Sequence, residues 1–285
     1  GKTDEGALPE RFVGFMREFR GACRSGQLAL RTEDTYCNWV ERFLVFEQPA
    51  SREEVDSDQA RQFLDYLAVK RRVSKASQDQ ALSALLFLFR SVLKRDLGEL
   101  GKVRRGAARR KLPVVLTREE VGQLLAELKQ EHQLMGQLLY GAGLRLMECV
   151  RLRVGELDFE RKTITVRSGK GNKDRVTVLP DSLVAPLQSH LVGVRDQFEK
   201  DMEAGVDGVY LPPSVEKKYP GAAREWAWQY VFPHRKISRD PRSNQMRRHH
   251  VIENTLQAAV KKAVKRAGIP KNVSCHTLRH SFATH

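Results

Sequence analysis

Cysteine is scarce in this sequence, and long apolar runs are missing. The 285 residues include only four cysteines (Cys23, Cys37, Cys149 and Cys275), and no two of them form a Cys-x-x-Cys pair. This spacing favours unpaired thiols in a reducing compartment over a disulfide framework or a zinc ribbon. No apolar run approaches the ~20 residues that a membrane-spanning helix needs, and the first residues lack the apolar stretch of a signal peptide. We therefore expect a soluble, cytoplasmic protein without a membrane partner.

Acidic residues are outnumbered by basic ones. Lysine and arginine total 50 against 35 aspartates and glutamates, which gives a formal net charge of +15 and a pI near 9.9. Such a charge argues against an ordinary near-neutral enzyme and for a polyanionic partner, either nucleic acid or an anionic membrane surface. Hydrophobic residues still make up 41% of the chain, so a sizeable core can form. A nucleic-acid-binding protein of about two domains is the starting expectation.

Residues 1–101 have the periodicity of a helical bundle. Phe12, Phe15 and Phe19 recur on one helix face, and three similar stretches follow them before residue 98. Four helices of this length make a small bundle with its own core. The aromatic stripes are therefore interpreted as core residues and not as a platform for stacking bases.

Residues 102–112 form a strongly basic segment. It contains six lysines and arginines and no acidic residue. Such a run repels itself and cannot pack, so it is interpreted as an interdomain linker. It is either a solvated tether or a strap along a phosphate backbone, and the overall charge of the chain favours the strap.

The remaining part of the chain, 113–285, mixes helices with a β-hairpin. Alternation of apolar and polar residues on both sides of a glycine-rich turn predicts strands over 163–167 and 175–179. A long helix is expected over 181–204, whereas 205–235 is rich in glycine, proline and aromatics and is expected to be irregular. The predicted fold class is mainly α with a small antiparallel β-sheet.

Several familiar sites are missing from the sequence. It has no GxxxxGK[ST] loop, its Gly-Lys-Gly-Asn-Lys run lies between expected strands and not before a helix, and it has no HExxH motif. His276 and His280 could hold a metal on one helix face, but only Cys275 stands nearby as a further ligand. No metal and no cofactor are therefore expected.

Three short motifs place cations where they could meet an anion. Arg145 follows a glycine turn, with Glu148 one helical turn later. Lys170 lies at the expected hairpin tip, and His276 and Arg279 share the start of a helix, where free backbone N–H groups favour an anion. Taken singly, the first pair could be a surface ion pair and Lys170 a solvated turn lysine.

Together, the three motifs resemble the catalytic domain of the tyrosine recombinases, the phage-integrase family. Gly-Leu-Arg-x-x-Glu, Gly-Lys-Gly-Asn-Lys-x-Arg and His-x-Leu-Arg-His occur in that order. The resemblance covers essentially the whole chain. It implies that 1–101 is a SAM-like core-binding domain, 102–112 the interdomain linker, and 113–285 a mixed α/β catalytic domain that is incomplete at its C-terminus.

The resemblance implies a reaction that needs neither metal nor cofactor. In this family a tyrosine hydroxyl attacks the scissile phosphorus of DNA and forms a 3′-phosphotyrosyl link. Arg145, Arg279 and His276 would hold the non-bridging oxygens, because positioned cations stabilise the charge that develops there. Lys170 would protonate the departing 5′ oxygen as general acid, and Glu148 would orient the clamp.

The segment from residue 216 to residue 250 resembles integron integrases in particular. Its stretches KYPGAAREWAWQYVFP, DPRS and RRHH look like a segment peculiar to those proteins, with an insertion at about 201–235 and a short inserted helix near 201–218. In integron integrases the matching Trp, Pro and His-His positions contact extrahelical bases. The DNA-contacting residues implied here are Trp228, Pro241, Arg247, Arg248, His249 and His250, with Lys173 and Arg175 of the hairpin. For the aromatic residues Trp226, Trp228 and Tyr230, the alternative is a small satellite core.

This resemblance also implies the partners. They are a double-stranded integron site, a folded single-stranded cassette hairpin, and further copies of the chain, with a tetramer in the synapse. The family's nucleophilic tyrosine lies downstream of the His-x-x-Arg helix, but the sequence ends at His285, so none of the tyrosines present is assigned as nucleophile and this chain is expected not to cleave DNA. Two alternatives stay open: a non-catalytic DNA-binding protein derived from a tyrosine recombinase, and a simpler integrase that reads duplex DNA only.

Overall fold

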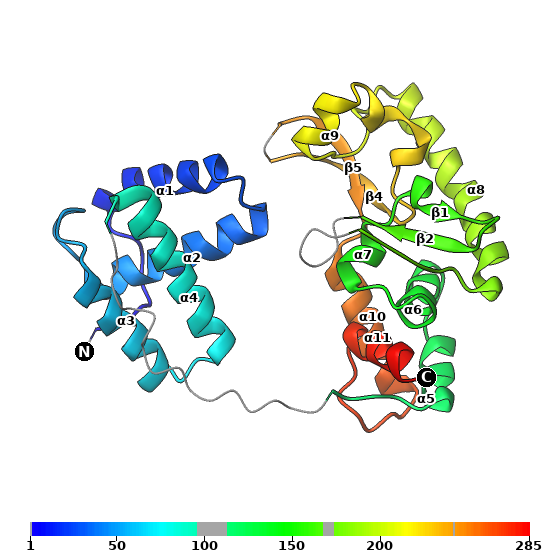
Figure 1. Cartoon of the computed structure of the whole chain (residues 1–285), viewed down its shortest axis with the longest axis horizontal. Coiled ribbons are helices and arrows are strands. Elements are labelled where there is room, and N and C mark those ends of the chain that lie inside the picture. The colour runs from blue at the N-terminus through cyan, green and yellow to red at the C-terminus, as the bar shows by residue number, and fades with distance from the viewer. Residues whose placement is uncertain (1, 96–112, 168–173, 242) are drawn as a thin grey trace. The chain divides into compact units, whose positions relative to one another are not determined.

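The chain divides into two compact units, residues 1–111 and 112–285, which are described separately. The computed structural model describes residues 2–95, 113–167, 174–241 and 243–285. Both units are mainly helical, and the second carries two small antiparallel sheets (Figure 1). The predicted fold class is therefore confirmed. The expected basic linker, 102–112, lies outside the described residues.

Within its described residues, unit 1 is a bundle of four α-helices. They run over Val13–Ser25 (α1), Leu30–Glu47 (α2), Ser57–Val69 (α3) and Lys75–Phe87 (α4). A 3₁₀ turn over Glu10–Phe12 precedes α1, and a π-helical stretch over Leu88–Leu93 continues α4. The four helices are as predicted, whereas the change of helical geometry after Phe87 has no signal in the sequence.

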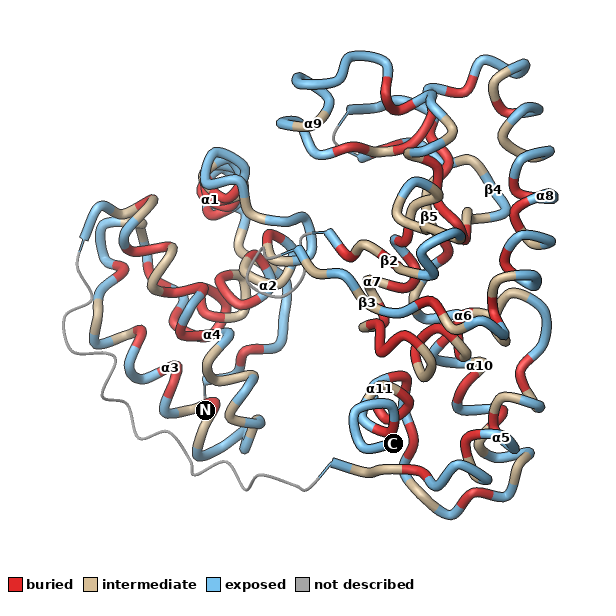
Figure 2. Tube along the Cα trace, turned by 45° about the vertical axis from the view of Figure 1, so that its right-hand side comes forward, coloured by how far each residue is buried: buried red, intermediate tan, exposed pale blue. Residues whose placement is uncertain are grey.

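Phenylalanine side chains fill the core of unit 1. Phe12, Phe19, Phe43, Phe63 and Phe89 are among the largest fully buried side chains of the chain. Buried residues lie along the inward sides of the helices (Figure 2). The interpretation of the aromatic stripes as core is confirmed.

Unit 2 is built around a central helix, α6. Its helices run over Arg118–Ala126 (α5), Glu131–Gly141 (α6), Leu146–Val150 (α7), Asp181–Glu203 (α8), Pro213–Lys218 (α9), Glu253–Arg266 (α10) and Cys275–Thr284 (α11). Helix α6 packs against α5, α7, α8, α10 and α11, and its Leu138 and Leu139 are fully buried. Helix α5 begins at a capping box, in which the Glu120 N–H donates to the Thr117 hydroxyl at 3.2 Å.

The first sheet of unit 2 contains the predicted hairpin. Strands β1 (Leu157–Asp158), β2 (Thr163–Val166) and β3 (Arg175–Val178) pair antiparallel in that order. The register sets Val166 opposite Arg175 and Ile164 opposite Thr177. Ile164 and Val166 are buried, so one face of β2 faces the core and fixes this register.

The second sheet of unit 2 is not predicted from the sequence. Strands β4 (Pro233–Arg239) and β5 (Met246–His250) pair antiparallel, with an irregularity between Pro233 and Ile237. The stretch 205–235, expected to be irregular, therefore ends in a strand. Its short helix α9 lies within 201–218, where the resemblance implies an inserted helix. The residues of β4, PHRKISR, are mostly polar and lack the apolar alternation by which a half-buried strand is recognised.

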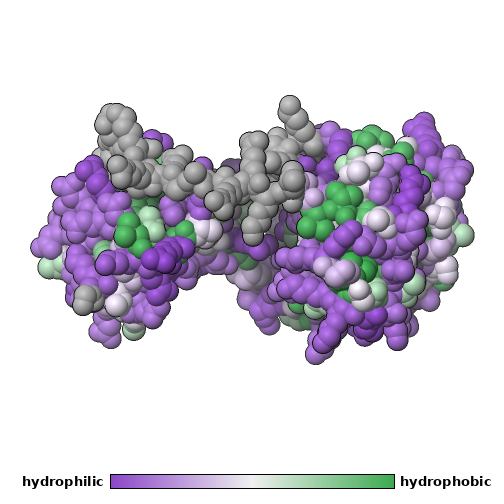
Figure 3. All heavy atoms as spheres, turned by 90° about the horizontal axis from the view of Figure 1, so that it is seen from below, coloured by the Kyte–Doolittle hydropathy of each residue, from purple (hydrophilic) through white to green (hydrophobic). Residues whose placement is uncertain are grey.

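The surface of the two units is mostly hydrophilic, and their cysteines are unpaired, as the composition of the chain predicts. Hydrophilic residues dominate the visible face of both units in Figure 3, with smaller apolar areas on each. Across the described ranges, no helix combines the length and the apolar character that crossing a membrane requires. The four cysteines are buried and free, and burial raises the pKa of Cys23 to about 12 and that of Cys275 to about 11, so these thiols stay protonated.

Candidate functional site

Arg145 and Glu148 stand at the start of α7, after a turn that requires glycine. Gly143 has a φ of +60°, and a Cβ there would collide with the ring of Phe282 in α11. Glu148 accepts hydrogen bonds from the backbone N–H of Arg145 at 2.7 Å and from its Nη1 at 2.6 Å. The predicted pair therefore forms, and the carboxylate fixes the direction of the Arg145 guanidinium group.

Arg175 closes the other side of Glu148. From the first position of β3, its Nη1 donates to Oε1 at 2.8 Å and its Nη2 to Oε2 at 2.6 Å. Two parallel bonds of this kind are among the stronger hydrogen bonds in proteins. The sequence suggested a DNA contact for Arg175, but both of its terminal nitrogens lie on Glu148, a partner too distant in sequence for any local pattern to reveal.

Arg279 completes the cluster from α11. Its Nη1 donates to the carbonyl of Gly143 and lies 3.8 Å from Oε2 of Glu148. The side chains of Arg145, Arg175 and Arg279 remain 35%, 31% and 28% exposed, so solvent and ligands can reach them. The structure thus brings three arginines from α7, β3 and α11 around one carboxylate, and we name these four residues the arginine cluster.

The arginine cluster carries an excess of positive charge. Burial alone would raise the pKa of Glu148, but hydrogen bonds from Arg175 and Arg145 outweigh it and lower the pKa to about 2. Burial lowers the pKa of Arg279, and the charges of Arg145 and Arg175 act in the same direction, whereas Glu148 opposes them. One carboxylate against three guanidinium groups leaves room for a further anion, and planar guanidinium forks match the oxygens of a phosphate.

Of the other predicted site residues, His276 lies on the same helix as Arg279, and two lysines lie outside the described residues. His276 is exposed in the first turn of α11, one helical turn before Arg279. Lys170 and Lys173 lie outside the described residues. In the part of the chain that the structure describes, no three His, Cys, Asp or Glu side chains form a metal-binding group. This holds also for the surroundings of His276 and His280.

We expect Glu148→Gln to lower the stability of unit 2 at neutral pH much more than in acid. The pKa of Glu148 in the folded state, about 2, lies below its ordinary value of 4.5. The ionised carboxylate therefore stabilises the fold fully above pH 4.5, and this contribution is lost as the pH falls through that window towards 2. Urea unfolding of the variant and the parent measures the difference in free energy of unfolding, which should shrink by more than half between neutral pH and about pH 3. A difference that stays constant over this range would contradict the assignment.

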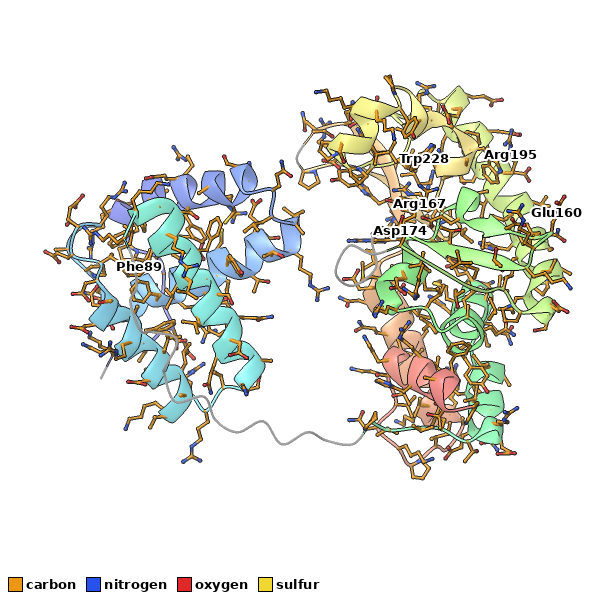
Figure 4. All side chains as sticks on the ribbon, in the orientation of Figure 1. Phe89, Glu160, Arg167, Asp174, Arg195 and Trp228 are labelled. Atoms are coloured by element: carbon orange, nitrogen blue, oxygen red, sulfur yellow. The ribbon has the colours of Figure 1, made fainter. Side chains whose placement is uncertain are left out.

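Trp228 lies in the insertion, next to Tyr219 and Arg167. The ring centroids of Trp228 and Tyr219 are 6.2 Å apart, and the Arg167 guanidinium carbon lies 5.9 Å from the centroid of Trp228. Arg167 follows directly after β2, and Figure 4 shows both labelled residues where the insertion meets the first sheet. Trp228 is half-buried and packs on a small cluster around Tyr230. The satellite core therefore exists, and Trp228, which packs against it, is only partly buried.

Trp226 has a different environment from Trp228. It packs against the main core of unit 2, with its ring centroid 5.5 Å from that of Phe198 in α8. The guanidinium carbon of Arg195 lies 5.0 Å from the Trp226 centroid. Trp226 is therefore a core residue, but it belongs to the main core and not to the expected satellite core.

The two histidines at the end of β5 are half-buried. Nδ1 of His250 donates to the carbonyl of Val251 at 2.7 Å, and its ring meets Tyr230 edge-on at a centroid distance of 5.4 Å. Burial lowers the pKa of both His249 and His250, so their rings are uncharged at neutral pH. Pro241 is exposed between β4 and β5.

Arg247 and Arg248 are buried, in contrast to the expected DNA contacts. They are 3% and 8% exposed. Arg247 donates to the carbonyl of Val209 at 2.7 Å, and Arg248 forms hydrogen bonds with both carboxylate oxygens of Asp201 and, at 2.7 Å, with the carbonyl of His234. As neighbours on one strand, the two side chains point to opposite faces of the sheet. The structure therefore places their charged groups inside the insertion and not on its outer surface.

Arg153 is a further residue that sequence reasoning missed. Its Nη1 donates to the carbonyl of Trp228, and its Nη2 donates to the carbonyl of Tyr210 at 2.8 Å and to the hydroxyl of Tyr230 at 3.2 Å. It also pairs with Tyr230 through the backbone. Arg153 thus joins the segment after α7 to the insertion, and nothing in the sequence distinguishes it from the other arginines.

Two family models match most of the chain. The model of the phage integrase family matches residues 114–285, and the model of the phage integrase N-terminal SAM-like domain matches residues 15–99. An integrase/recombinase of Escherichia coli is 45% identical over 284 residues, which cover 99% of this chain and 84% of that protein. Tyrosine recombinase XerA of Thermococcus onnurineus is 35% identical over 231 residues, which cover 79% of this chain and 67% of that protein.

Solved structures agree with this fold. The XerH recombinase in a post-cleavage complex with a palindromic difH substrate aligns with a TM-score of 0.55 at 19% identity, over 94% of this chain and 72% of that one. The Tn1549 transposon integrase in complex with transposon right-end DNA aligns with a TM-score of 0.56 at 17% identity, over 94% of this chain and 85% of that one. At these identities the likeness concerns the fold. With the two family models and the E. coli relative, it follows that the chain belongs to the phage integrase family of tyrosine recombinases.

Proposed function

We propose that this protein is a site-specific recombinase of the integron type, which joins a double-stranded integron site to cassette sites folded from single-stranded DNA. The observation that carries the proposal is the insertion. It holds the half-buried Trp228, and the uncharged rings of His249 and His250 follow on β5, in the same unit as the arginine cluster. Flat uncharged surfaces suit an unpaired base, and the arginine cluster suits a phosphate.

The proposed reaction breaks and rejoins one DNA strand. The oxygen of a nucleophilic tyrosine bonds to the scissile phosphorus, while the bond from phosphorus to the 5′ oxygen breaks. The tyrosine loses a proton and the 5′ oxygen gains one, for which Lys170 is the proposed general acid. Arg145, Arg279 and His276 hold the non-bridging oxygens, where negative charge builds up. The 3′-phosphotyrosyl link keeps the energy of the phosphodiester, so rejoining needs no nucleotide cofactor.

The insertion is proposed to read a base that protrudes from the folded strand. Stacking of a base on an aromatic side chain contributes about 1–3 kcal/mol. Trp228 is proposed to supply the ring. The Arg167 guanidinium group lies beside that ring and is proposed to contact the base or its phosphate. The ring of His250 meets Tyr230 of the satellite core, and His249 and the exposed Pro241 add flat or apolar surfaces further along the β4–β5 hairpin.

DNA is the proposed partner, and the net charge of +15 supports it. So do the XerH and Tn1549 structures, which are complexes with DNA. The proposed assembly is a homotetramer that holds two DNA recombination sites together. Its proposed location is the cytoplasm. The contacts among Arg145, Glu148 and Arg279 argue against a non-catalytic descendant of a recombinase, and the insertion argues against an integrase for duplex DNA only.

We expect Trp228→Ala to weaken binding of a folded hairpin by about tenfold, and only when the hairpin carries its protruding base. The reason is that the variant loses the stacking surface and keeps the many phosphate contacts. The measurement is a pair of titrations, one on the hairpin with the base and one on the same hairpin with that base deleted. His250→Ala should show the same pattern, with weaker binding of the hairpin that carries the base and little change on the hairpin without it.

Trp226→Ala is the matched control for this experiment. This variant also removes an indole ring from the 3₁₀ turn Trp226–Trp228, but the ring of Trp226 packs against the main core and not against the satellite core. Any loss of binding in this variant should be equal on the two hairpins. If Trp228→Ala also weakened both equally, or neither, Trp228 would belong to the satellite core alone.

A further inference from the structure

The inner face of β3 holds the turn at Gly143 from both sides. Arg175 and Thr177 are two residues apart and therefore lie on one face of the strand. The Thr177 hydroxyl donates to the carbonyl of Ala142 at 2.9 Å, and Arg175 donates to both oxygens of Glu148 at 2.8 and 2.6 Å. One contact precedes the glycine turn and the other follows it, so β3 fixes the segment that leads into α7.

The outer face of the same strand points to solvent. Val176 is 65% exposed and Val178 is 54% exposed. A strand with one solvated face usually turns its apolar residues inward and its polar ones outward. Here the arrangement is reversed, because the inward positions are used by Arg175 and Thr177 for polar contacts with the arginine cluster and its turn. This reversal indicates that the inward polar side chains serve the site.

We propose that Arg175 is a positioning residue of the cleavage site, which acts through Glu148 and not by contact with DNA. Because Arg175 holds both carboxylate oxygens, Glu148 stays 3.8 Å from Arg279 and does not close on it. The Arg279 guanidinium group therefore keeps its charge for a phosphate oxygen. This inference rests on the proposed role of Arg145 and Arg279 as phosphate ligands.

The first test is Arg175→Gln in the complete recombinase with its nucleophilic tyrosine. Glu148, released from Arg175, is expected to turn to Arg279 and neutralise it, which slows single-turnover strand cleavage about 100-fold. Affinity for site DNA should change by less than about twofold, and its dependence on salt should stay the same. If Arg175 contacted a phosphate instead, affinity would fall and the salt slope would decrease by about one, which would overturn the inference.

The second test repeats the substitution in a Glu148→Gln background. An uncharged glutamine does not compete for Arg279, so Arg175→Gln should slow cleavage much less there than in the parent. A general loss of folding would slow cleavage equally in both backgrounds, and that result would also overturn the inference. Arg175→Lys keeps the charge but cannot form two parallel bonds, so its rate should lie between those of Arg175→Gln and the parent.

Arg161→Gln is the control for a lost arginine in the same sheet. Arg161 is 85% exposed before β2 and lies 3.9 Å from its nearest carboxylate, Asp158, so its cleavage rate should equal that of the parent. Arg279→Ala separates this inference from the proposed function. Parental cleavage by Arg279→Ala would remove the proposed catalytic role itself. A loss in Arg279→Ala together with a parental rate in Arg175→Gln would overturn only the role of Arg175.

Discussion

Arg279→Ala and Arg145→Ala should each slow strand cleavage by the complete recombinase by more than about 100-fold. The negative charge of the transition state lies on the non-bridging oxygens, where these guanidinium groups are proposed to bind. DNA affinity should fall only slightly, because it is spread over many contacts and one lost phosphate contact changes the salt slope by about one. A suicide substrate that traps the covalent intermediate measures cleavage, and a salt series of titrations measures affinity.

The two measurements together decide whether Arg145 and Arg279 act in chemistry or only in binding. A variant that cleaves the suicide substrate at a parental rate would refute the clamp. If a variant lost cleavage and DNA affinity in equal proportion, the substituted arginine would be an ordinary DNA contact without a role in the chemical step. Glu148 is not a substitute target for this purpose, because its loss also removes the stabilisation that its ionised form gives the fold.

Asp201→Ala should lower the free energy of unfolding of unit 2 by about 3–5 kcal/mol. Asp201 is the carboxylate partner of the buried Arg248, and both of its oxygens accept from that guanidinium group. Without the carboxylate, a charged group remains buried with too few acceptors. Chemical unfolding monitored by tryptophan fluorescence measures the effect.

Glu199→Ala provides the matched control on the same helix, α8. Glu199 pairs with Arg195 at 2.7 Å, but both side chains are about half exposed. Exposed pairs at this spacing contribute only about 0.3–0.5 kcal/mol. A paired replacement of Asp201 by leucine and Arg248 by methionine should recover much of the lost stability, because it removes both charges. Similar losses in Asp201→Ala and Glu199→Ala would contradict the buried pair.

Most of the helices and the hairpin of the first sheet could be predicted because their signals are local. The phenylalanine spacing in unit 1 repeats within one helix, and the capping box at Thr117 spans four residues. The hairpin of β2 and β3 alternates apolar and polar residues on both sides of a glycine-rich turn. The motifs that contain Arg145, Glu148 and Arg279 also lie on short segments, and the structure brings them together as their resemblance to recombinases implies.

The contacts that could not be predicted join residues that are distant in sequence. Glu148 and Arg175 are 27 residues apart, and Asp201 and Arg248 are 47 apart. In a basic chain every arginine can be assigned to DNA, and only the fold shows which ones are used inside the protein. The burial of Arg247 and Arg248 and the contacts of Arg153 are such cases.

The alternation along β3 makes the site sensitive to strand slippage. A shift of β3 by one residue against β2 would preserve a two-stranded ladder and exchange the faces of the strand. Val176 and Val178 would then face Glu148 and the Gly143 turn, and Arg175 and Thr177 would face solvent. A single-residue insertion or deletion within β3 would thus leave a carboxylate that has lost its principal counter-charge. Alignments of related recombinases should accordingly show few single-residue insertions or deletions inside β2 or β3.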